Sequence, residues 1–165
     1  MEFNSLLLWL HVFSGATWFG AVMLFGMVVG PTIGDFTPST SGEVVIKLLP
    51  RYLRFIAIFT LITPLLGLVT ALYSSNWDFS IFSSSTTFGV WMMAGAALSL
   101  VAWVVTFGVV YPTGRKIIRI TEGFVKSNTP QPPGLPKLAM RLKISSGIGM
   151  VLLIAILVCM VAASA

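Results

Sequence analysis

The side chain with the clearest chemical potential in this sequence is His11, the only histidine in the chain. It stands inside a long apolar stretch, where a polar group is costly and is a candidate functional residue. At about 100° per residue of an α-helix, Gly15 and Trp18 share its face. A glycine leaves room beside the ring, and an indole can flank a planar or cationic ligand. We therefore take His11, Trp18 and Gly15 as candidate cofactor-binding residues. The alternative is a histidine hydrogen-bonded to a neighbouring helix, with Trp18 as packing.

Sulfur-bearing side chains are expected at the same depth as His11. Met92 and Met93 lie near the start of the third apolar stretch, and Cys159 and Met160 lie near the end of the fourth. Imidazole, thioether and thiol are the soft ligands that copper(I) prefers. The predicted metal ligands are therefore His11, Met92, Met93, Cys159 and Met160. Packing is the alternative for the methionines, which are ordinary filler in apolar helices.

Haem b is the second cofactor that His11 could serve, as an axial ligand opposite a methionine or no protein group. A haem held by two histidines of one chain is excluded, because there is one histidine. The sequence contains no phosphate-binding loop and no dinucleotide fingerprint. We therefore predict no catalytic residues, and copper, haem b or no cofactor at all.

Four apolar stretches must position these residues. They are long enough to cross a bilayer, which takes roughly 20 residues, and they run over 5–30, 55–74, 88–111 and 144–163 without any Asp, Glu, Lys or Arg. Of the 165 residues, 56% are hydrophobic and 9% are charged, whereas soluble domains carry about 25% charged residues. A soluble globular enzyme is therefore excluded. The sequence predicts one transmembrane domain over 1–165, an all-α four-helix bundle.

The basic residues are confined to two connections between the apolar stretches. Lys47, Arg51 and Arg54 lie in 31–54, and all the other lysines and arginines lie in 112–143. Cytoplasmic loops of membrane proteins are enriched in Lys and Arg. We therefore predict a multi-pass protein of the cell membrane with both connections cytoplasmic and both termini outside. The net charge of +5 then reflects topology, not a nucleic-acid partner. A site for lipid headgroups or an acidic partner is the alternative.

Parts of these connections also have helical patterns. Residues 112–126 are expected to continue the third helix, with an apolar stripe near the lipid headgroups. Residues 37–49 suggest a short helix that ends before Pro50, and Pro64 is expected to kink the second span.

A faint internal repeat links the two halves of the chain. The first and third spans end in Val28-Val29-Gly30-Pro31-Thr32 and Val109-Val110-Tyr111-Pro112-Thr113. The second and fourth follow Leu49-Pro50-Arg51 and Leu135-Pro136-Lys137. A parallel two-helix repeat is one explanation. The other is that basic loops after a span often look alike.

The first span, Leu10-His11-Val12-Phe13-Ser14-Gly15-Ala16-Thr17-Trp18-Phe19-Gly20, carries a resemblance to known membrane proteins. With Arg51-Tyr52-Leu53-Arg54, Gly67 and the Val-Tyr-Pro that precedes Arg115 and Lys116, it resembles the four-helix superfamily of copper resistance protein D. Its first span is also similar to HemJ-type protoporphyrinogen oxidases. The resemblance implies an integral membrane bundle that handles copper or a tetrapyrrole near its outer half. The HemJ-type oxidases also have a lysine in the third span, where this chain has none, so only His11 is carried over.

The leading hypothesis is a non-enzymatic membrane protein that binds copper or haem through His11 near the outer half of the bilayer. The alternatives are a haem-linked membrane oxidoreductase and a structural or assembly subunit of a membrane complex. Besides the lipid bilayer, the expected partners are another membrane protein or a second copy of the chain, since Gly26 and Gly30 form a helix-packing motif.

Overall fold

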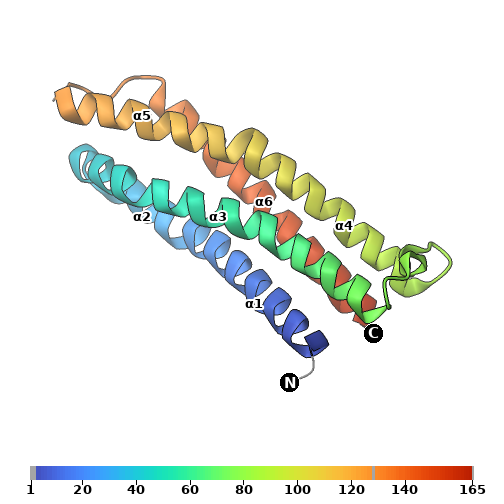
Figure 1. Ribbon diagram of the computed structural model, residues 1–165. Coiled ribbons are helices and arrows are strands. Elements are labelled where there is room, and N and C mark those ends of the chain that lie inside the picture. The colour runs from blue at the N-terminus through green and yellow to red at the C-terminus, as the bar shows by residue number, and fades with distance from the viewer. Residues whose placement is uncertain (1–2, 128, 165) are drawn as a thin grey trace.

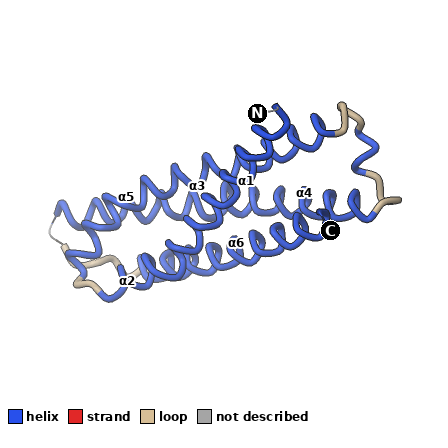
Figure 2. Tube along the Cα trace, turned by 90° about the horizontal axis from the view of Figure 1, so that it is seen from below, coloured by secondary structure: helices blue, strands red, loops and turns tan. Residues whose placement is uncertain are grey.

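The chain folds into four long helical rods, as the four apolar stretches predict. The computed structural model describes residues 3–127 and 129–164, and every regular element in these ranges is helical (Figure 2). In chain order the elements are α1 (Phe3–Leu24), η1 (Phe25–Val29), α2 (Gly30–Asp35), α3 (Pro38–Ser74), η2 (Phe79–Phe82), α4 (Thr87–Val105), η3 (Thr106–Val110), α5 (Tyr111–Ser127) and α6 (Leu135–Ser164). The rods Phe3–Asp35, Pro38–Ser74, Thr87–Ser127 and Leu135–Ala163 are each long and apolar enough to cross a membrane. The protein is therefore an all-α four-helix bundle, consistent with a multi-pass membrane protein.

The rods run side by side, so that the bundle has two distinct ends. Figure 1 shows both chain ends and the α3–α4 connection at one end, and the α2–α3 and α5–α6 connections at the other. We call these the terminal end and the basic end, because every lysine and arginine of the sequence lies on the second side. The closest helix pairs are α1 with α3 and α4 with α6, and α1 also packs against α6.

The outer surface of the bundle is apolar. Trp9, Leu100 and Val151 are 67%, 68% and 63% exposed, and they belong to three different rods. Soluble monomers rarely expose apolar side chains on this scale. The surface is instead the kind that a lipid environment accommodates, in agreement with the scarcity of charge in the spans.

The helix expected to end before Pro50 does not end there. Helix α3 continues through Pro50 and Pro64 to Ser74, although an internal proline removes one backbone hydrogen bond. Leu49 and Leu53, on either side of Pro50, are 4% and 1% exposed. Packing on both sides of the proline therefore holds the helix together at this point.

The amphipathic segment 112–126 continues the third helix, as expected, and its position near the headgroups stays a prediction. It forms α5, whose apolar stripe packs against the first half of α3. A Cβ atom on Gly114 would lie 2.7 Å from Cδ1 of Leu53, and one on Gly42 would lie 2.8 Å from Cγ2 of Val125. These two glycines therefore allow α3 and α5 to approach closely beyond the apolar spans.

The two halves share a local irregularity that supports the repeat. The segments η1 and η3 are π-helical and occupy the same place before Pro31 and Pro112 in the repeated motif. The residue before each proline donates its N–H five residues back, Gly30 to the carbonyl of Phe25 and Tyr111 to that of Thr106. A proline ring clashes with the carbonyl four residues before it in a regular helix. The wider turn relieves this clash.

Candidate functional site

His11 is buried between α1 and α3 in the terminal half of the bundle. Its side chain is 8% exposed, and its Nδ1 lies 3.0 Å from the carbonyl oxygen of Thr63. A carbonyl can only accept a hydrogen bond, so Nδ1 must carry the hydrogen. In the neutral ring the lone pair is therefore on Nε2. Within residues 3–127 and 129–164, no protein group forms a hydrogen bond to Nε2.

Gly67 of α3 makes the space that the imidazole occupies. A Cβ atom on Gly67 would lie 2.7 Å from Cε1, 3.1 Å from Nδ1 and 3.3 Å from Nε2 of His11. The ring therefore lies directly against the backbone of α3. The predicted neighbour Gly15 has a different role, since a Cβ there would only make ordinary contact, at 3.5 Å, with Cγ2 of Thr63.

The segment of α3 that faces His11 is polar and interrupted by a proline. Pro64 follows Thr63 directly and has no N–H to give to the carbonyl of Thr60. The Thr60 hydroxyl is bonded to the carbonyl of Ile56 at 2.6 Å. The Thr63 hydroxyl is buried without a hydrogen-bond partner in the described part of the chain. The His11 contact is thus a polar spot in an apolar bundle, and polar groups inside membranes mark functional candidates.

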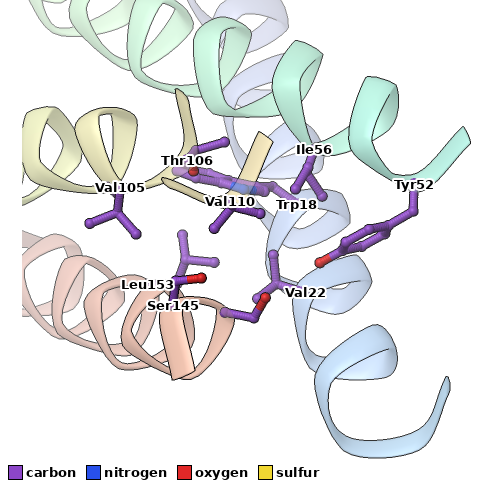
Figure 3. A pocket seen from close by; sticks show the side chains of 12 residues that line it. Trp18, Val22, Tyr52, Ile56, Val105, Thr106, Val110, Ser145 and Leu153 are labelled. Carbon is purple, nitrogen blue, oxygen red and sulfur yellow. The ribbon is translucent and has the colours of Figure 1, made fainter. Parts of the chain in front are cut away.

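Trp18 does not share a site with His11. Seven residues separate them, which is about 10 Å along the helix axis. Trp18 is 4% exposed and lines a small pocket together with Ile56 of α3, Ala102 and Thr106 of the third rod, and Leu153 of α6 (Figure 3). The cavity volume is about 20 Å³, enough for one water molecule. Trp18 therefore packs in the core.

The predicted sulfur ligands divide between the core and the surface. Cys159 is buried and its Cβ would lie 3.5 Å from a Cβ on Gly95 of α4. Met92, one helical turn before Gly95, is half-buried. Met93 and Met160 are 37% and 38% exposed. Of the predicted sulfur ligands, Cys159 and Met92 are thus the most buried.

The helix register places Cys159 at the level of His11. Trp18, Ala102 and Leu153 line one pocket. Two helical turns from this pocket towards the terminal end, α1 has reached His11, α4 has reached Gly95 and α6 has reached Met160. Met160 directly follows Cys159. His11 lies between α1 and α3, however, while Cys159 lies between α4 and α6. Among the described residues, no three His, Cys, Asp or Glu side chains form a metal-binding group.

Two residues that define the His11 environment were not in the predicted site. Thr63 supplies the carbonyl, and Gly67 supplies the space. The signals in the sequence were a threonine before a proline inside a span and a glycine one turn later. Neither signal could identify His11 as the partner, because the pairing depends on how α1 and α3 are rotated towards each other.

The chain was also compared with known proteins. No model of a protein family, no curated protein and no solved structure matches it.

Proposed function

We propose that this chain is a multi-pass membrane protein that binds one copper(I) ion in the terminal half of its bundle, with Nε2 of His11 as the nitrogen donor. The observation that carries the proposal is the hydrogen bond from Nδ1 to the carbonyl of Thr63. Histidines that bind metals usually donate their other ring N–H to a carbonyl or carboxylate, which fixes the tautomer and the ring orientation. His11 is held in this manner, and its remaining nitrogen has no protein partner among the described residues.

Cys159 and Met92 are the sulfur donors that best complement His11. Both belong to the α4–α6 pair at the level of His11, and α1 packs against α6. Copper(I) favours thiolate and thioether ligands, and a lone ion needs little space. Binding requires the Cys159 side chain to turn towards Nε2 of His11 across the bundle interior. Met93 and Met160, which are exposed at the surface, are secondary candidates.

Haem fits this environment less well than copper. The Nε2 atom lies close to the backbone of α3 at Gly67, so a porphyrin beside it would require α1 to move away from α3. The pocket beside Trp18 and a groove lined by Ile144 and Ile148 both lie away from His11. The haem-linked oxidoreductase considered as an alternative depends on the same cofactor, and the geometry does not favour it.

Copper competition measurements test the proposal. Purified protein is titrated with copper(I) under reducing conditions against a chromophoric copper(I) chelator. We expect one tightly bound ion, and at least a tenfold loss of affinity in His11→Ala and in Cys159→Ser, since even the loss of a group that hydrogen-bonds to a metal ligand typically costs 10–100-fold. Met27→Leu is the matched control, because Met27 is 60% exposed on the same rod, towards the basic end. If the unaltered protein binds no copper, or His11→Ala binds it equally well, the proposal is wrong.

A structural or assembly subunit is the second candidate, and the same contact favours it. A buried imidazole that bonds to a backbone carbonyl of a neighbouring helix joins α1 to α3 whether or not a metal binds. This function predicts that His11→Ala lowers stability equally with and without copper. It also predicts that the protein co-purifies with a membrane partner in mild detergent.

The orientation in the membrane belongs to the same proposal. Lys and Arg gather at the basic end, and this bias is typical of cytoplasmic faces. With the basic end in the cytoplasm, both termini and the proposed copper site lie in the outer half of the cell membrane. Cysteine-labelling of single-cysteine variants in intact cells, with Cys159 replaced and a cysteine placed at Ser84 or Lys126, tests this orientation.

A further inference from the structure

An open apolar groove runs along the outside of the bundle near its basic end. It lies between the third rod and α6, with a volume of about 410 Å³, within the size range of ligand pockets. Its apolar walls are Val105 and Val109 on one side and Ile144 and Ile148 on the other. Ile144 and Ile148 are 58% and 49% exposed, so no described part of the chain covers them.

Two basic residues stand at one end of this groove. Lys137 and Arg141 line it from the first turns of α6 and are followed on the same side by Ile144 and Ile148. Neither has a carboxylate partner, since the one ion pair of the described residues joins Lys47 to Glu43. The lining of the groove therefore changes along α6, from two unpaired positive charges at one end to apolar side chains at the other.

We propose that this groove holds one anionic phospholipid, with its phosphate at Lys137 and Arg141 and an acyl chain along Ile144 and Ile148. Charge complementarity selects the headgroup, because basic pockets between helices at this side of a membrane bind anionic headgroups. The length agrees as well. Lys137 and Ile148 are roughly 16 Å apart along α6, at 1.5 Å per residue, which is close to half of a bilayer core of about 30 Å.

The π-helical segment η3 helps to shape the groove. Val109 belongs to η3, and Val105 directly precedes it. A π turn widens the helix locally and often occurs at functional sites. In the first half, the repeat places Arg51 where the second half has Lys137, but Phe25 of η1 stacks there on the neighbouring Tyr52, with 3.7 Å between the ring centroids. The lipid site proposed for the second half is independent of the copper site.

Native mass spectrometry in detergent tests the proposal with two lipids that have identical dioleoyl chains, phosphatidylglycerol and phosphatidylcholine. We expect the unaltered protein to retain one phosphatidylglycerol at least tenfold more tightly than phosphatidylcholine. Each basic group near a membrane surface strengthens such binding roughly fivefold. The double variant Lys137→Gln/Arg141→Gln should therefore bind phosphatidylglycerol roughly 25-fold more weakly and phosphatidylcholine unchanged.

Lys116→Gln/Arg119→Gln is the matched control. These substitutions in α5 also remove two positive charges at the basic end, but the two exposed residues do not line the groove. Its phosphatidylglycerol affinity should equal that of the unaltered protein. Equal binding of the two lipids by the unaltered protein, an equal loss in the control pair, or a second protein chain that occupies the groove and excludes lipid would each overturn the proposal. The comparison of the two lipids needs no variant, so it holds even if the double variant misfolds.

Discussion

Replacing Gly67 with alanine should separate α1 from α3 at the buried imidazole. The new methyl group would lie 2.7 Å from Cε1 of His11, closer than packed carbon atoms can remain. The ring cannot simply rotate away, because Nδ1 is bonded to the carbonyl of Thr63 and the side chain is 8% exposed. The two helices must therefore shift, or the hydrogen bond must break.

The expected cost follows from three contributions. Forcing an extra methyl into a packed interior costs about 1–3 kcal/mol. Loss of a hydrogen bond between membrane helices adds roughly 0.6 kcal/mol. Alanine offsets about 1 kcal/mol of this, because it favours the helix more than glycine does. We expect Gly67→Ala to lower the free energy of unfolding by about 0.6–2.6 kcal/mol.

Reversible unfolding in mixed micelles, followed by circular dichroism, measures this difference. Gly20→Ala is the control, because nothing lies within 4 Å of its added Cβ, and it should be neutral or slightly stabilising. The double variant His11→Ala/Gly67→Ala completes the test. Without the imidazole, the alanine at position 67 has space, so Gly67→Ala should no longer destabilise the protein in that background.

Two outcomes would refute this reasoning. One is a Gly67→Ala protein as stable as the Gly20→Ala control. The other is an equal loss on Gly67→Ala with and without His11, since residues in contact should show a coupling energy of 0.5–3 kcal/mol. Either outcome would mean that the imidazole is not held against α3.

Three further predictions concern other parts of the chain. Gly114→Ala should destabilise by about 1–3 kcal/mol in the same assay, because its Cβ would lie 2.7 Å from the buried Leu53; Leu53→Ala should abolish the added penalty. Thr121→Val should stabilise by roughly 1 kcal/mol, because the Thr121 hydroxyl is buried without a partner in the described chain; lower stability would show that an ordered water satisfies it. Hydrogen bonds from the hydroxyl and N–H of Ser80 hold the pKa of Asp78 below its usual value. The hydrogen bonds from Ser80 should therefore stabilise the η2 turn fully at a pH above the usual carboxyl pKa. This stabilisation should be lost as the pH falls through the lowered pKa of Asp78. Carboxyl carbon NMR shifts would follow the titration, and an ordinary pKa for Asp78 would contradict the bonding.

The sequence was sufficient for the architecture, because hydropathy and charge directly report the lengths and ends of the spans. It was less informative about the extensions. Pro50 suggested a helix end, but burial of Leu49 and Leu53 outweighs one lost hydrogen bond. The stripe of α5 is amphipathic in the sequence, yet periodicity alone could not identify α3 as the helix that it packs against.

The candidate site was predicted only in part. The hypothesis of a histidine bonded to a neighbouring helix describes the observed contact of His11, and its metal role stays a prediction. Helical spacing put Trp18 on the face of His11, as observed, but Trp18 lines a pocket that His11 does not reach. The partners Thr63 and Gly67 depend on the rotation of α3 about its axis, which no single-helix pattern contains.

The π-helical turn of η3 also determines which residues of the third rod face the bundle interior. Ala102 and Thr121 are both 2% exposed and face into the molecule, yet nineteen residues separate them, where five α-helical turns take about eighteen. The wide turn absorbs the additional residue, so the buried stripe continues from α4 into α5 without rotating. Counting in steps of 3.6 across Thr106–Val110 would displace every later residue by roughly 100°. A related chain with a regular helix at this place is therefore expected to be one residue shorter there.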